Sequence, residues 1–193
     1  MGIAKTKEIL VDVARKLFAA KGFDDTTMND IAQASQKGRR TLYTYFKNKE
    51  EVYFTVIESE LFQLANRLKI VAQQATNPQE RLIEYIYTRM DAIKEIVLRN
   101  GNLKADFFTN AVLVERVRRK LDFREKAILK EILAEGMEQK MFNVDDPKFA
   151  ALMIHHALKG LEIPYIRGEL EGLMRERKNS IINFIFYGLK KSL

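Results

Sequence analysis

Residues 26–50, TTMNDIAQASQKGRRTLYTYFKNKE, decide the fold of this chain. A short amphipathic pattern leads into a tight polar turn, and a second short pattern that carries several positive charges follows the turn. From Lys37 to Lys49 the sequence has five basic side chains and no acidic one. Two short helices in this order, with the charge on the second, are typical of a helix-turn-helix element that reads duplex DNA.

Capping signals support this interpretation. Thr27, with Asp30 three residues later, predicts a capping box at the start of the first short helix. Asn48 with Glu51 gives the same signal for a longer helix. Gly22 is expected to end the preceding helix in a left-handed conformation. The helices expected in this part of the chain cover about 5–20, 27 onward, 38–45 and 48–75.

The stretch resembles the N-terminal domain of the TetR family of bacterial transcriptional repressors. The matching residues are Thr26-Thr27, Asp30-Ile31-Ala32, Thr41-Leu42-Tyr43, Phe46 and Lys49-Glu50, preceded by Ile9–Phe18 and Gly22-Phe23. The resemblance is dense over residues 7–54. It implies an all-α protein with a three-helix DNA-binding domain at 1–50, a connecting helix from residue 48, and a helical ligand-binding and dimerisation domain at 51–193.

The expected DNA contacts follow from the chemistry of groove recognition. Arg39 and Arg40 open the second short helix, where arginine can bind guanine bidentately. Gly38 lets the backbone approach DNA, and Leu42 and Phe46 should point inward. The other expected contacts are the hydroxyls of Thr27, Thr41 and Tyr43 and the ammonium groups of Lys37 and Lys49. A solvated surface role is the alternative for each arginine, and packing is the alternative for Tyr45.

The turn departs from the family pattern. Most members have glycine, a small apolar residue and serine here, whereas this chain has Gln36, Lys37 and Gly38. Gln36 tolerates a left-handed backbone less well than glycine does. Lys37 replaces a side chain that usually closes the small core, although its stem can lie along an apolar surface.

Charge and composition agree with a DNA-binding head. Residues 1–50 carry ten Lys and Arg against six Asp and Glu, whereas the other 143 residues carry 23 against 20. Cysteine is absent, which excludes disulfides and thiolate metal sites and suits the cytoplasm. No apolar run approaches the ~20 residues of a membrane helix. Residues 1–6 match the short N-myristoylation pattern, for which we favour a chance match.

The rest of the chain also reads as helix. Asn77-Pro78 opens a helix whose buried stripe is expected at Leu82, Ile86, Met90, Ile93 and Val97. The later predicted segments are a short one at 103–109, a long helix over about 112–140, a helix from Pro147 that stops at Ile163 before Pro164, and a last helix over about 170–190.

The resemblance implies that the last two helices form the dimer interface, for which we single out Leu152, His156, Phe184 and Ile185. Two heads on a two-fold axis also suit a pseudo-palindromic operator. The alternative is that these residues form the core of a monomer. The resemblance further implies a cavity for a small-molecule effector, with Met90, Phe107, Phe108 and Phe123 as candidate lining residues, although residues of each kind are more often plain core.

Enzyme functions are disfavoured. The sequence has no phosphate-binding glycine loop, nucleophile elbow or Glu-x-x-His metal motif. The adjacent His155 and His156 point about 100° apart on a helix, so they cannot share a metal. We expect no catalytic residue, cofactor or metal. A sequence-specific repressor released by a ligand is the leading hypothesis, and a helical adaptor with a degenerate head is the alternative.

Overall fold

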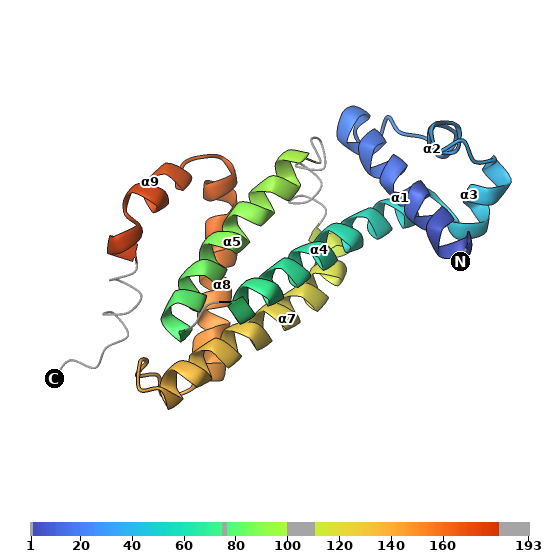
Figure 1. The fold of residues 1–193 in the computed structure, drawn as a ribbon. Helices are drawn as coiled ribbons and strands as arrows, with labels where there is room; N and C mark the ends of the chain where they lie inside the picture. The colour runs from blue at the N-terminus through green and yellow to red at the C-terminus, as the bar shows by residue number, and fades with distance from the viewer. Residues whose placement is uncertain (1, 75–76, 100–110, 182–193) are drawn as a thin grey trace. The chain divides into compact units, whose positions relative to one another are not determined.

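The computed structural model describes residues 2–74, 77–99 and 111–181, and every regular element in these ranges is a helix (Figure 1). The described helices are α1 (Gly2–Lys21), α2 (Met28–Ala34), α3 (Arg39–Tyr45), α4 (Lys49–Gln74), α5 (Pro78–Arg99), α7 (Ala111–Glu138), α8 (Pro147–Ile166) and α9 (Glu171–Glu176). The all-α prediction is confirmed. Across the described ranges, we find no helix with the length and apolarity to span a membrane. The segment predicted at 103–109 lies outside the described residues.

The chain divides into two compact units. The first comprises the described residues within 1–62 and 95–119, and the second those within 63–94 and 120–193. The division of the sequence at residue 50 into two functional domains remains a prediction.

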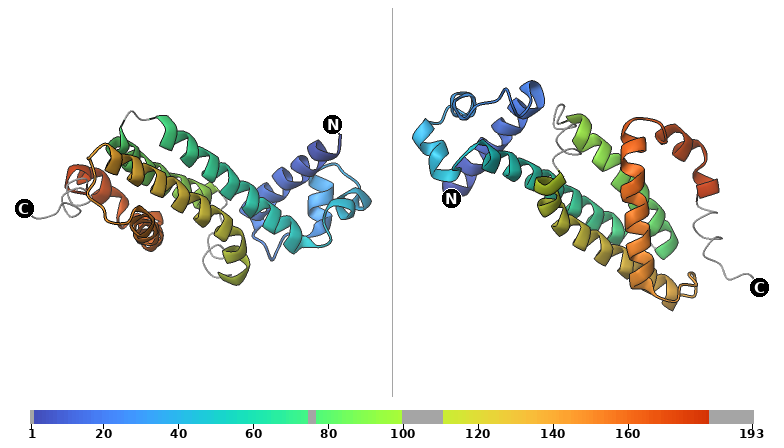
Figure 2. Two further views of the ribbon diagram at one scale, coloured as in Figure 1. Left: turned by 90° about the horizontal axis from the view of Figure 1, so that it is seen from below. Right: turned by 180° about the vertical axis from the view of Figure 1, so that it is seen from behind.

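The first unit contains the head. Figure 2 shows α1, α2 and α3 gathered beside the first turns of α4. Its core consists of apolar side chains from each of these helices: Leu10, Ala14, Phe18, Ile31, Leu42, Phe46, Val52 and Val56. The ring of Phe23 lies 5.8 Å from that of Phe18 and 4.8 Å from that of Tyr53. Arg15 of α1 also approaches the buried carboxylate of Glu60 on α4 at 3.2 Å.

The capping signals predicted at Thr27 and Gly22 are confirmed, and the one predicted at Asn48 is confirmed in part. Thr27 Oγ1 accepts from the Asp30 N–H at 3.1 Å, and Asp30 Oδ2 accepts from the Thr27 N–H at 2.9 Å. Gly22 has a φ of 89°, the left-handed conformation expected after α1. Asn48 Oδ1 accepts from the Glu51 N–H, but Glu51 returns its carboxylate to the N–H of Lys47 rather than to Asn48.

The second unit packs α5, α7 and α8 around a core that also takes in part of α4. The stripe predicted for α5 is buried along its whole length. Tyr165 of α8 donates to Asp91 Oδ1 of α5 at 2.5 Å, and Arg175, on α9, binds the same oxygen at 2.9 Å. Lys94 of α5 pairs with Glu171 of α9. These contacts hold α9 against the α5–α8 pair.

The end of α7 is shaped by one close approach. A Cβ built on Gly136 would lie 2.1 Å from the ring of Phe142, so only glycine fits beneath this ring. The carbonyl of Gly136 accepts from the N–H groups of Met141 and Phe142, and Lys140 has a left-handed φ of 58°. The chain therefore reverses tightly after α7 and leads into α8, which Asp146 caps as predicted.

Two helix predictions were wrong. The helix from Pro147 does not stop at Ile163 but includes Pro164 and ends at Ile166. Proline removes one donor, yet the last turn buries Tyr165 completely, and this burial offsets the loss. The helix predicted over 170–190 is interrupted, because α9 ends at Glu176 and a turn at residue 177 precedes a helical segment at 178–181. Residues 182–190 lie outside the described part.

Candidate DNA interface and a buried charged cluster

The second helix of the predicted reader presents its basic end to solvent. Arg39 and Arg40, the first two residues of α3, are exposed, and Tyr43 one turn later is 48% exposed. Leu42 on the opposite face and Phe46, the C-cap of the helix, are buried in the head, at 0% and 1% exposure. The buried face fixes the helix, so the arginines project from a supported surface.

The turn before α3 places a residue other than glycine in the left-handed conformation, which is unfavourable for it. Gln36 has a φ of 55°, in the left-handed region. The N–H of Gln36 donates to Gln33 and that of Lys37 to Ala32, which closes the end of α2. Gly38 is the N-cap of α3 and has no side chain to cap the first N–H groups of the helix. A helix N-terminus with free donors suits a phosphate group.

The other residues predicted to contact DNA differ in whether their polar groups already form bonds within the protein. Thr27 is exposed but uses its hydroxyl in the capping box. Thr41 and Lys37 are half-buried. The ammonium of Lys49 donates to the carbonyl oxygens of Phe23 at 2.6 Å and Asp24 at 3.1 Å, and it lies 4.3 Å from the centre of the Phe23 ring. Lys49 therefore ties the start of α4 to the loop after α1, which leaves one N–H for a phosphate.

Comparison with known proteins agrees with this geometry. Residues 10–56 match the family model of bacterial regulatory proteins of the tetR family. The chain is 26% identical over 152 residues to YhgD, an HTH-type transcriptional regulator of Bacillus subtilis, covering 77% of this chain and 78% of that protein.

Solved structures share the fold over most of the chain. A TetR-family regulator from Syntrophomonas wolfei superposes with a TM-score of 0.73 at 17% identity, covering 98% of this chain and 99% of that one. The SmeT–triclosan complex superposes with a TM-score of 0.63 at 21% identity, covering 85% and 79%.

The chain belongs to the TetR family. It is a DNA-binding transcriptional regulator, and members of this family are not enzymes. The predicted family and the helix-turn-helix assignment are therefore confirmed.

The residues predicted in the body of this TetR-family protein are scattered. Met90 is buried in α5 at 1% exposure, whereas Phe123 of α7 is 74% exposed and does not face an enclosed interior. Leu152 and His156 lie exposed on α8. Phe107, Phe108, Phe184 and Ile185 lie outside the described residues.

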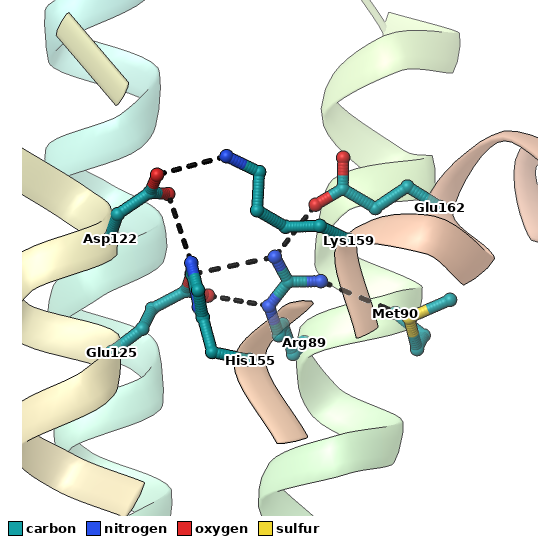
Figure 3. Close-up of polar contacts among 7 residues, drawn as sticks. All are labelled: Arg89, Met90, Asp122, Glu125, His155, Lys159 and Glu162. Atoms are coloured by element: carbon teal, nitrogen blue, oxygen red, sulfur yellow. Dashed lines mark hydrogen bonds and ion pairs between the residues drawn. The ribbon is translucent and has the colours of Figure 1, made fainter. Parts of the chain in front are cut away.

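The body also contains a buried cluster of charged side chains from three helices. Arg89 of α5 is 0% exposed and lies between two carboxylates (Figure 3). Its Nε lies 2.6 Å from Glu125 Oε1 of α7, and its Nη2 lies 2.6 Å from Glu162 Oε1 of α8. Lys159 of α8 pairs with Asp122 Oδ2 of α7 at 2.9 Å.

His155 lies between the two acidic residues of α7. Its Nε2 is 3.6 Å from Asp122 Oδ1, and its Nδ1 is 3.3 Å from Glu125 Oε2. Burial alone would lower the pKa of His155, but the two carboxylates outweigh burial and raise it. Burial would likewise raise the pKa of Asp122, but His155 and Lys159 hold it well below its usual range.

Sequence reasoning missed this cluster. Asp122 and Glu125 look like ordinary surface charges of an amphipathic helix, and Arg89 is separated from Glu125 by 36 positions. The three-residue spacing of Asp122 and Glu125 does place both on one helix face. No local signal shows that this face is turned inward. Of the two adjacent histidines, His155 is buried and His156 is exposed.

Proposed function

We propose that the protein is a homodimeric repressor that binds a pseudo-palindromic operator and leaves it when a small molecule binds to the helical body. The observation that carries the proposal is the exposed basic end of α3 above a buried apolar face. A helix anchored by Leu42 and Phe46 can enter the major groove without losing its packing against the head.

We assign each predicted contact a role. Arg39 and Arg40 read base edges, because their guanidinium groups are exposed at the start of α3. Gly38 allows close approach of the backbone. The hydroxyls of Thr41 and Tyr43, the capping Thr27, and the ammonium groups of Lys37 and Lys49 bind phosphates, which position the helix without specifying sequence.

An exposed apolar face on α8 supports the dimer. Phe149, Leu152, Met153 and Ile163 are 60%, 37%, 55% and 41% exposed. Their spacing, together with His156, puts them on one side of the helix. An apolar strip of this kind is unusual on the surface of a monomer and suits a second copy of the chain. We assign Leu152 and His156 to this interface, and we propose Phe184 and Ile185 as further members.

The effector part of the proposal rests on relatives, of which SmeT was solved with triclosan. Met90, buried in α5, is the described residue that we propose for the effector site, and Phe107 and Phe108 remain candidates. A repressor of bacterial genes acts in the cytoplasm, where we place this protein.

Selection of bound fragments from random duplexes tests the DNA-binding proposal. We expect enrichment of a two-fold symmetric sequence with half-sites about one helical turn apart. Binding to that site should be nanomolar and should weaken steeply with salt. Weak binding that ignores sequence would instead indicate a helical adaptor.

Light scattering tests the dimer. We expect a dimer at micromolar concentration, and Met153→Glu should shift it toward monomer because a charge would be buried in the interface. Met141→Glu is the matched control, since Met141 is 47% exposed and lies outside α8. Equal effects of the two substitutions would remove α8 from the interface.

A further inference from the structure

The charged cluster in the body leaves several buried polar atoms unsatisfied. Arg89 binds Glu125 and Glu162, and Lys159 binds Asp122 Oδ2. Within the described part of the chain, Asp122 Oδ1 and His155 Nδ1 are buried and form no hydrogen bond of good geometry, although they lie 3.6 Å from His155 Nε2 and 3.3 Å from Glu125 Oε2. A buried polar atom without a partner costs about 1–3 kcal/mol. Both atoms therefore retain the capacity to bind a further group.

A third unsatisfied atom lies on the neighbouring helix. Tyr85 is one turn before Arg89 on α5 and is fully buried, and its hydroxyl is also without a hydrogen-bond partner in the described residues. Burial and the nearby carboxylates of Glu125 and Asp122 raise the pKa of Tyr85. The phenol therefore stays neutral and offers an oxygen near the same carboxylates.

The geometry suits a metal ion. One ligand atom from each of Asp122, Glu125 and His155 lies within 4.8 Å of the others, and all three residues are buried. Donors about 2.1 Å from a tetrahedral metal lie about 3.4 Å apart. The Nε2 of His155 lies 3.6 Å from Asp122 Oδ1 and its Nδ1 lies 3.3 Å from Glu125 Oε2, so the imidazole must turn before one of its nitrogens can bind an ion together with both acids.

We propose that Asp122, Glu125 and His155 form a binding site for a divalent transition-metal ion inside the body of this protein. Two carboxylates and one imidazole form a ligand set that suits Zn²⁺, Mn²⁺, Fe²⁺ or Co²⁺. The site lies on facing helices, α7 and α8, as metal sites of helical bundles do. It stands independently of the repressor function, because it requires neither DNA nor a dimer.

The surrounding side chains can support such an ion. Arg89 holds Glu125 by both carboxylate oxygens, which fixes the ligand's position, as partners of metal ligands commonly do. Carboxylate oxygens keep further lone pairs while accepting these bonds. Lys159 reaches Asp122 from the rim and is 24% exposed, so its ammonium can withdraw to solvent when a cation arrives.

The net charge of the cluster can be balanced by a bound cation. Asp122, Glu125 and Glu162 bring three negative charges, and Arg89 with Lys159 brings two positive ones. One negative charge remains when His155 is neutral. A proton on His155 balances that charge, and so does a divalent ion once Lys159 has moved into solvent.

Zn²⁺ calorimetry and the visible absorption of bound Co²⁺ test the proposal on the full-length chain without an affinity tag. We expect one ion per chain and a Co²⁺ spectrum of a site of low coordination number. His155→Gln should weaken binding at least ~10-fold. His156→Gln is the matched control, because His156 is adjacent but exposed, and it should leave binding unchanged.

Three outcomes would overturn the site. They are no binding by the unsubstituted protein, equal loss in the His155→Gln and His156→Gln variants, and unchanged binding in the His155→Gln variant. If His155→Gln does not fold, Asp122→Asn tests the site instead. Asp122 is less deeply buried than His155, and asparagine has the same shape as aspartate. Unchanged Co²⁺ absorption in a folded Asp122→Asn variant would mean that the ion binds elsewhere and that His155 serves only as an internal cation.

Discussion

The arginine side chains are exposed to solvent in one charged region of this molecule and buried in the other. Arg39 and Arg40 stand in water at the start of α3, whereas Arg89 is fully enclosed between Glu125 and Glu162. An exposed guanidinium costs little to maintain and is available to a partner. A buried one is stable only while its carboxylates remain. The comparison separates charge that is available for binding from charge that joins helices.

The largest expected effect is that of Arg89→Met. The substitution fills the volume but leaves two carboxylates buried without their cation, so we expect the free energy of unfolding to fall by about 3–5 kcal/mol. Urea denaturation followed by circular dichroism measures it. A loss below about 1 kcal/mol would mean that Glu125 and Glu162 are neutralised or solvated without Arg89.

Arg39→Ala should show the reverse pattern. We expect binding to the selected operator to weaken by about 1–3 kcal/mol with a changed base preference. The free energy of unfolding should change by less than about 0.5 kcal/mol, because the side chain is exposed. Fluorescence anisotropy on operator variants and urea denaturation measure the two quantities. Unchanged operator affinity would remove this face of α3 from the interface.

Lys49→Ala tests a basic residue that is half-buried, between the exposed Arg39 and the buried Arg89. Its ammonium binds the carbonyls of Phe23 and Asp24, so we expect a stability loss of about 1–2 kcal/mol. A phosphate role adds an equal weakening on all DNA sequences and a salt slope smaller by about one. Lys47→Ala is the matched control, because Lys47 is exposed nearby. A stability loss with an unchanged salt slope would leave Lys49 with a purely structural role.

The smallest expected effect is that of Gln36→Gly. Glycine relieves the left-handed conformation at φ 55°, so we expect the head to gain roughly 0.5–1 kcal/mol, reduced by the greater freedom of glycine in the unfolded chain. Gln33→Gly within α2 should instead destabilise the protein by about 1 kcal/mol. Thermal unfolding of both variants measures the difference. A destabilising Gln36→Gly would show that the Gln36 side chain stabilises the turn.

The same comparison explains which features could be predicted from the sequence. The head follows from signals a few residues apart, such as Thr27 with Asp30, Asn48 before α4, and Gly22 after α1. Each of these signals depends only on residues a few positions away, and the structure confirms the helix ends that they predict. The DNA contacts themselves remain predictions, because exposure of Arg39 shows availability and not binding.

The body is less predictable because its decisive contacts join distant residues. The Arg89–Glu162 pair spans 73 positions, and no local pattern marks either residue as buried. Pro164 misled the prediction of α8 for a related reason. Its local tendency to stop a helix was overridden by the burial of Tyr165, whose bond to Asp91 spans 74 positions.

The ring of Phe142 lying on Gly136 carries a consequence for the evolution of this protein. A side chain at 136 and an aromatic ring at 142 cannot occupy the same space. A larger residue at position 136 alone would clash with the ring, and a smaller residue at position 142 alone would leave a cavity at the end of α7. Each single substitution is therefore expected to be selected against. Sequences descended from a common ancestor should change the two positions together, which would leave a paired substitution pattern across this loop.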